Sequence, residues 1–223
     1  MNITPDATIY WQYGVVKINA TLIMTWATMV VLAICSWFIT RGLGSNYNLA
    51  RWSNLLEILM VFIMKQIQEV GLKKPEKYLS LLVTLFLFLA SSTFLSLIPG
   101  YVPATASLST TAALAICVFF AVHFYGISEK GLLGYLKRYI QPNILMLPFN
   151  IITDLSRTLA LAVRLFGNMS SGTMVIGIIL LVAPVIFPVA IQLLGLLTGF
   201  VQSYIFTVLA MVYIAAGVSG KDA

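Results

Sequence analysis

LALAVRLFGNM, residues 159–169, places one arginine in the middle of an otherwise apolar stretch. A charged side chain at the centre of a bilayer costs about 2.5–3.5 kcal/mol on insertion scales, and a guanidinium cannot escape this cost by losing its proton. Membrane proteins keep such a residue where it faces a cavity, a partner or an ion path. Arg164 therefore predicts a chain that handles ions inside a membrane.

The composition of the whole chain agrees with a membrane protein. Of its 223 residues, 60% are hydrophobic and only 9% are charged, whereas a soluble domain carries about 25% charged residues. The net charge of +6 does not indicate nucleic acid, because aromatic and basic residues are not interleaved. Cys35 and Cys117 each lie in an apolar run, which favours neither a disulfide framework nor a metal site. We expect an all-α integral membrane protein without a cofactor.

Hydrophobic runs divide the chain into its membrane helices. They cover residues 20–40, 78–98, 104–126, 144–183 and 187–217. A perpendicular span needs about 20 residues, so the first three runs fit one crossing each. A continuous helix over 144–183 would measure about 60 Å, twice the hydrocarbon thickness. We therefore expect about five membrane helices, with the last two long, strongly tilted and joined as a hairpin by the turn at 183–188.

The segments between the runs complete a single membrane domain over residues 1–223. Residues 49–72 mix apolar side chains with charged ones, which is typical of an interfacial amphipathic helix, and a second, shorter one is expected over 131–140. The first residues lack a signal-peptide pattern. The predicted parts are an outer N-terminal segment (1–19), a first span (20–40), the interfacial helix (49–72), a helical hairpin (78–126) and the long tilted hairpin (144–217).

Basic residues predict the orientation of the chain. Lys17 alone lies on one side, whereas ten of the 13 Lys and Arg residues lie on the other: Arg41, Arg51, Lys65, Lys73, Lys74, Lys77, Lys130, Lys137, Arg138 and Lys221. Lys and Arg concentrate in cytoplasmic segments of membrane proteins. The N-terminus is therefore expected outside and the C-terminus in the cytoplasm or the equivalent compartment.

One face of the fourth run is polar. At 100° per residue, an arc of roughly 100° contains Asp154, Arg157, Arg164, Asn168 and Ser171. Asp154 and Arg157 are three residues apart and can pair, which favours a structural role for Arg157. Arg164 has no acidic residue within one turn of its own helix. We expect a carboxylate from another element or another subunit to approach it.

The last run repeats this pattern. An arc of about 80° contains Gln192, Gly195, Gly199, Gln202 and Tyr213. Gly195 and Gly199 form a small-xxx-small pair, which predicts the close approach of another helix. Gln202 is expected to meet Arg164 or Asn168 across the hairpin.

These residues closely resemble those of a known family. RLFGNM (164–169), preceded by LALAV and followed by SSG, resembles the signature of subunit a of F-type ATP synthases. Further resemblances cover about residues 45–217, in NLLEILMVFI (54–63), SLIPGYVPATASLS (96–109), PFNIITDLSRTLAL (148–161) and QSYIFTVLAMVYI (202–214).

The resemblance implies a non-catalytic stator subunit whose partners are the c-ring, b-type peripheral stalk subunits and lipid, with the ATP chemistry on other subunits. Arg164 would separate two aqueous half-channels that carry protons or sodium ions to and from the ring carboxylates. Asn168 and Gln202 match family positions beside the arginine, and Asp154 matches an acidic position near the helix entrance. The implied location is the bacterial plasma (inner) membrane, or alternatively a thylakoid or organellar membrane.

The chain departs from the family pattern at three positions. Thr173 stands where many members carry Glu, and Gly172 and Gly195 stand where some carry His. A proton relay through these groups is therefore in doubt, and a water or sodium path, as in the sodium-type subclass, remains open. The candidate ion-translocation residues are Arg164, Asn168, Gln202, Asp154, Thr173, Ser171 and Gln192, and the candidate packing residues are Gly195 and Gly199.

Two other functions fit a charged residue at mid-membrane. A small secondary transporter would bind its substrate or a proton at Arg164 and Asp154, but it predicts internal repeats that the sequence does not display. A scaffold subunit would leave Arg164 without a role. The sequence contains no phosphate-binding Gly-rich loop and no metal-ligand spacing, which argues against a catalytic chain.

Overall fold

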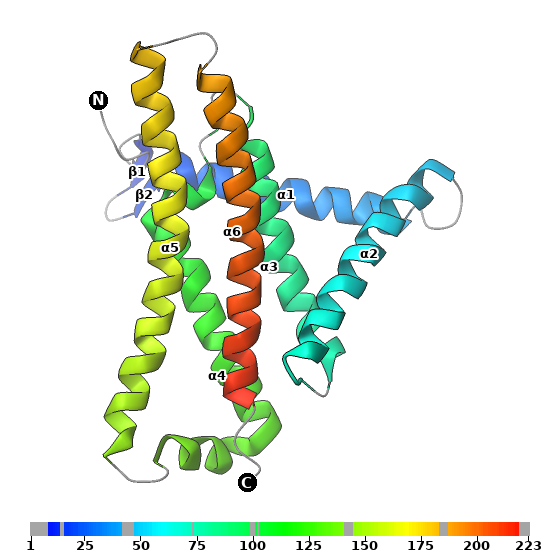
Figure 1. Cartoon of the computed structure of the whole chain (residues 1–223), viewed down its shortest axis with the longest axis vertical. Coiled ribbons are helices and arrows are strands. Elements are labelled where there is room, and N and C mark those ends of the chain that lie inside the picture. Colours follow the sequence, from blue (N-terminus) through cyan, green and yellow to red (C-terminus); the bar gives the residue numbers. More distant parts are fainter. Residues whose placement is uncertain are drawn as a thin grey trace.

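The computed structural model describes residues 9–13, 16–41, 47–72, 74–98, 101, 103–140, 145–182 and 187–218, and Figure 1 gives their arrangement. In chain order the elements are β1 (Ile9–Tyr13), β2 (Val16–Asn19), α1 (Ala20–Arg41), α2 (Tyr47–Glu69), α3 (Pro75–Leu95), the short 3-10 helix η3 (Ala104–Ala106), α4 (Leu108–Ile140), α5 (Met146–Val182) and α6 (Phe187–Val218). The predicted all-α class is confirmed, apart from one small hairpin.

That hairpin lies in the predicted outer segment. β1 and β2 pair antiparallel, with Tyr13 opposite Val16 and Gln12 opposite Lys17. Aromatic and β-branched residues make up most of β1 and half of β2, and such residues favour extended backbone. The segment before the first helix is therefore folded at residues 9–13 and 16–19.

Three described helices are long and apolar enough to cross a membrane. They cover Pro75–Leu95, Leu108–Lys137 and Val189–Val218, and a shorter apolar helix covers Thr21–Trp37. These correspond to α3, α4, most of α6 and most of α1. The total of about five crossings and the tilt of the last two helices stay predictions.

Helix α6 packs against α3, α4 and α5. Leu82 and Leu89 of α3 are fully buried, as are Leu161 and Leu165 of α5 and Phe206 of α6. The outward faces are also apolar, and many of their Leu, Ile, Val and Phe side chains are exposed. Such extensive exposed apolar surface marks contact with a membrane or with partner proteins.

The helix α1 extends away from the bundle, and α2 returns to it and meets α3 at its C-terminal end (Figure 1). Ile63 and Ile67 are buried there, and Gly71 (φ +91°) ends the segment in a conformation that favours glycine. The remaining surface of α2 exposes the polar residues Glu57, Lys65 and Gln68, together with Ile58 and Val61. The helix is therefore amphipathic, as predicted for residues 49–72, while its place at the membrane surface stays a prediction.

The helix α4 bends at Gly131, whose φ of +72° interrupts the helical backbone. After this kink the chain remains helical over the stretch predicted as the second interfacial helix. Leu132, Leu133 and Leu136 are exposed on it, whereas Tyr135 is buried against the bundle. The last turns of α4 therefore run across the end of the bundle beneath α5 and α6 (Figure 1).

The long helices α5 and α6 lie side by side and antiparallel (Figure 1). Helix α5 has 37 residues and α6 has 32, so α5 alone measures about 55 Å. Their bounds agree with the predicted hairpin, and the turn at 183–186 lies outside the described residues.

Candidate functional site

Arg164 lies midway along α5 and is exposed at the surface of the chain. Within the described part of the chain it forms no hydrogen bond and no ion pair. The expectation of a counter-charge from another subunit is consistent with this surface and stays a prediction.

A hydrogen bond joins α5 to α6 one turn beyond Arg164. Asn168 Nδ2 donates to Gln202 Oε1 at 2.7 Å, which confirms the predicted contact between these two residues. Gln202 is only 3% exposed, and its Nε2 donor has no hydrogen-bond partner among the described residues. A buried amide donor without a hydrogen-bond partner lowers the stability of a protein by about 1–3 kcal/mol. Binding of an acceptor to Gln202 Nε2 would remove this cost.

The two candidate packing glycines have different surroundings. A Cβ on Gly199 would lie 2.5 Å from Thr93 Cγ2 and 2.9 Å from Met169 Cε, so α3 and α5 both approach α6 closely there. A Cβ on Gly195 would meet no atom within 4 Å. The predicted close approach is therefore present at Gly199. No described residue of this chain approaches Gly195 in the same way, and the close approach of another helix there stays a prediction.

The half of the hairpin next to the turn between α5 and α6 carries the remaining candidates. A Cβ on Gly172 would also meet open space. Ser171 Oγ donates to the Asn168 carbonyl at 3.1 Å, and Gln192 Nε2 donates to the carbonyls of Ser96 and Leu97, both at 3.4 Å. Gln192 therefore ties α6 to the end of α3. Thr173 lies on α5, and its side chain is outside the described residues.

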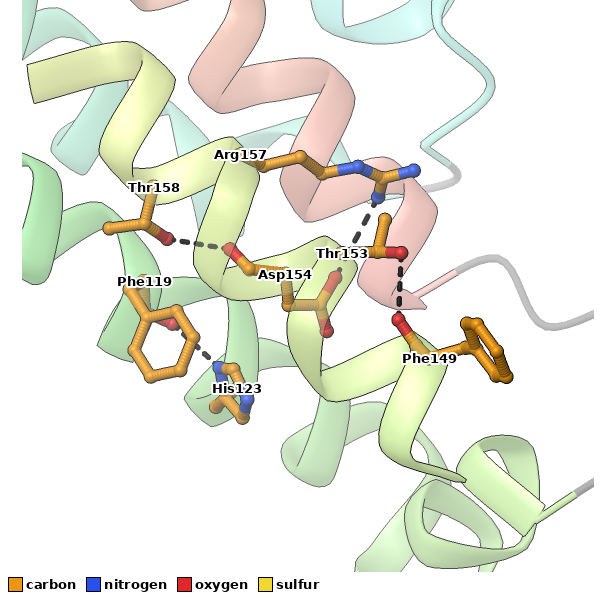
Figure 2. A network of polar contacts seen from close by, with 7 residues as sticks. All are labelled: Phe119, His123, Phe149, Thr153, Asp154, Arg157 and Thr158. Atoms are coloured by element: carbon orange, nitrogen blue, oxygen red, sulfur yellow. Dashed lines mark hydrogen bonds and ion pairs between the residues drawn. The ribbon is translucent and has the colours of Figure 1, made fainter. Parts of the chain in front are cut away.

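The other half of the hairpin, near the end of α6 at Val218, holds a charged pair. Arg157 Nη1 lies 3.7 Å from Asp154 Oδ1, which confirms the predicted pairing of these side chains (Figure 2). The distance is an ion-pair distance, longer than a hydrogen bond. The guanidinium carbon also lies 5.6 Å from the ring centroid of Tyr213 on α6, within the range of a cation–π contact.

A small cavity adjoins this pair. It has about 20 Å³ of space for the centre of a water molecule, enough for one. Its walls come from α4, α5 and α6 and include His123, Asp154, Arg157 and Tyr213. His123 lies below Asp154 in Figure 2 and donates from Nδ1 to the Phe119 carbonyl at 2.8 Å, since a carbonyl only accepts. Sequence reasoning missed this cavity because three separate helices form it.

Comparison with known proteins now identifies the family. A family model described as ATP synthase A chain matches residues 22–215. The chain belongs to the ATP synthase subunit a family. It is 59% identical over 221 residues to ATP synthase subunit a of Albidiferax ferrireducens, which covers 99% of this chain and 96% of the relative. It is 58% identical over 222 residues, the full length of both chains, to ATP synthase subunit a 1 of Prosthecochloris aestuarii. With ATP synthase subunit a 2 of Acaryochloris marina it shares 58% over 216 residues, or 97% and 92% of the two chains.

Membership of the ATP synthase subunit a family fixes the broad role. The chain is a non-catalytic, multi-pass subunit of the membrane sector in the bacterial inner membrane, and it takes part in ion translocation with the other ATP synthase subunits. Catalysis on ATP lies on those subunits. The family therefore decides against the secondary-transporter alternative.

Proposed function

We propose that this chain is the stator that passes ions between two half-channels and the carboxylates of the c-ring, with Arg164 as the charge that separates the half-channels. The observation that carries the proposal is the environment of Arg164: it is exposed, midway along α5, and no described side chain of its own chain pairs with it. Such a charge needs a counter-ion from another subunit, because lipid cannot solvate it.

A ring carboxylate meets this need. Near Arg164 it stays ionised, because an opposite charge within about 4–6 Å lowers the pKa of a carboxyl group. Facing lipid it must be neutral, protonated or bound to sodium, because desolvation penalises the charge. Rotation of the ring past Arg164 therefore requires that an ion leaves on one side and another enters on the other.

The amide pair beside Arg164 supports the same role. Gln202 is buried and bonded to Asn168 through Oε1, which fixes the amide and leaves its Nε2 hydrogens available. An amide donor in this position can hydrogen-bond a carboxylate or a water molecule during the exchange. Asn168, one helical turn from Arg164, thereby orients Gln202, and we expect the Gln202 donor to serve a carboxylate or water molecule that enters between α5 and α6.

The outer half-channel would run past Gly172, Gly195, Ser171 and Thr173, without the acid and histidine of many family members. A Cβ on either glycine would meet open space, so the positions that could hold a titratable group offer room for water. Gln192 lies between this region and the end of α3. The inner half-channel would open beside Asp154. This arrangement suits a hydrated cation at least as well as a proton relay, so both ions enter the test.

The test is ATP-driven ion uptake in inverted membrane vesicles that contain the complex, with and without sodium. Arg164→Ala should abolish uptake while the complex still assembles, and Lys137→Ala, which removes an exposed charge outside the site, should behave like the wild type. Sodium uptake that resists a protonophore identifies a sodium stator, and acidification without sodium identifies a proton stator. Normal coupled uptake by Arg164→Ala would refute the proposal.

A further inference from the structure

The polar face of α5 carries two arginines with opposite environments. Arg157 precedes Arg164 by seven residues, which is about two turns and about 10 Å along the helix axis. Arg164 has no partner among the described side chains, whereas Arg157 has a carboxylate at 3.7 Å and the ring of Tyr213 at 5.6 Å. One cation is therefore compensated within the chain and the other is not.

Both partners of Arg157 act on its charge. Asp154 supplies a full negative charge from the same helix, and the face of Tyr213 supplies the negative side of its quadrupole from α6. Figure 2 shows the Arg157 side chain extending across α6, away from His123. The side chains of Arg157 and Asp154 are 43% and 22% exposed, so neither is enclosed by the chain.

This compensated cation lies where an ion would pass. Arg157, Asp154 and Tyr213 all line the small cavity at the inner end of the hairpin, together with His123. The charged and titratable groups that face this cavity are thus Asp154 and Arg157 from α5, His123 and Tyr135 from α4, and Tyr213 from α6. An unbalanced positive charge here would repel an entering cation, since two unit charges interact strongly at the low effective dielectric of a protein.

We propose that Asp154 and Tyr213 are positioning residues that neutralise Arg157 and hold it against α6, so that the inner ion path is passable to cations and Arg164 alone is left to engage the ring. This inference rests on the proposed stator function. It assigns Asp154 a role different from that of an ion carrier: the carboxylate cancels a neighbouring charge, and the ion does not have to bind to it.

The two roles of Asp154 make opposite predictions in a double mutant. Asp154→Asn keeps the size of the side chain and leaves Arg157 without its counter-charge. We expect ATP-driven uptake in inverted vesicles to fall about tenfold or more, with a higher external ion concentration needed for half-maximal uptake, because the freed cation opposes entry. Asp154→Asn with Arg157→Gln removes both charges and should restore uptake to within about twofold of that of Arg157→Gln alone, since the pair then has no net charge left to balance.

Tyr213 provides a second test on another helix. Tyr213→Phe keeps the aromatic face and should retain uptake, whereas Tyr213→Leu should lower it and be rescued by Arg157→Gln. The amount of complex in the membrane is measured for every variant. If Asp154→Asn does not assemble, Tyr213→Leu with and without Arg157→Gln tests the inference in its place.

Three results would overturn the inference. In the first, Asp154→Asn takes up ions as well as the wild type. In the second, the double mutant is as inactive as Asp154→Asn although Arg157→Gln alone is active. In the third, Arg157→Gln alone is inactive. The second result would make Asp154 itself the ion carrier, and the third would make the charge of Arg157 a requirement. None of these results concerns Arg164, whose own substitution tests the stator function separately.

Discussion

Gly199→Ala should disturb the ion path although it adds a single methyl group. The new Cβ would lie 2.5 Å from Thr93 Cγ2, 2.9 Å from Met169 Cε and 3.1 Å from Thr93 Oγ1. Carbon atoms in contact are about 3.5–4.0 Å apart, so the first of these contacts is too short by about 1 Å. Either Thr93 or the helix itself has to move.

The surroundings of Thr93 decide how the strain is relieved. Thr93 is buried, and its hydroxyl donates to the Leu89 carbonyl at 2.9 Å, so rotation of the side chain breaks a buried hydrogen bond. Added methylene groups in a packed core cost about 1–3 kcal/mol. A shift of α6 by about 1 Å would relieve the overlap instead, but it would lengthen the 2.7 Å bond between Asn168 and Gln202, since Gln202 is one turn from Gly199. Both routes lower stability, and the second also lowers transport.

The assay compares three variants in the purified complex, by thermal unfolding, and in inverted vesicles, by ATP-driven uptake. Gly199→Ala should lose stability and transport together. Gly195→Ala adds the same methyl group where no atom lies within 4 Å, so it should be neutral or stabilised by up to about 1 kcal/mol from helix propensity. Thr93→Ala combined with Gly199→Ala removes both obstructing atoms of Thr93 and leaves only the flexible end of Met169 in the way, so it should recover most of the loss. Equal behaviour of Gly199→Ala and Gly195→Ala would refute the packing argument.

Two further substitutions test other contacts. Gln202→Leu should lower uptake in vesicles about tenfold without loss of assembly, because Asn168 loses its acceptor and the site loses its buried amide. Leu209→Met, a conservative change on the same helix, should leave uptake unchanged. Full activity of Gln202→Leu would exclude the amide from the ion path. Gly126→Ala should destabilise the complex by about 1–3 kcal/mol, because its Cβ would overlap the ring of Tyr135. Thermal unfolding measures this loss. An unchanged midpoint of thermal unfolding would mean that the last turns of α4 move aside without cost.

The bounds of the last two helices could be predicted from the sequence because apolar runs and prolines mark them directly, whereas α4 continues as helix well past the predicted run 104–126. The runs at 144–183 and 187–217 agree with α5 and α6 to within two residues at each end. The hairpin at β1 and β2 also left a signal, two stretches of aromatic and β-branched residues separated by Gly14 and Val15. That pattern favours paired strands, but it is short beside the apolar runs that dominate the composition.

The Asn168–Gln202 contact could be predicted from the faces of two helices, but contacts that involve a third helix could not. Gly195 and Gly199 share a face of α6, so periodicity treats them alike. Thr93 of α3 lies against only one of them, and nothing in the last run indicates which. The inner cavity likewise needs residues from α4, α5 and α6, and their register follows from the packing of three helices.

The two arginines of α5 also differ in their contacts, although they share one helix face. Periodicity places Arg157 and Arg164 on one face, yet Arg157 meets Asp154 and Tyr213 and so holds the inner ends of α5 and α6 together. Arg164 meets no described partner in its own chain. Since neither lipid nor the apolar surface around it can balance a guanidinium, the stable arrangement requires a negative group from outside. We infer that the ring lies against the part of α5 that carries Arg164, and that the Asp154–Arg157 pair marks where the chain balances its own charges instead.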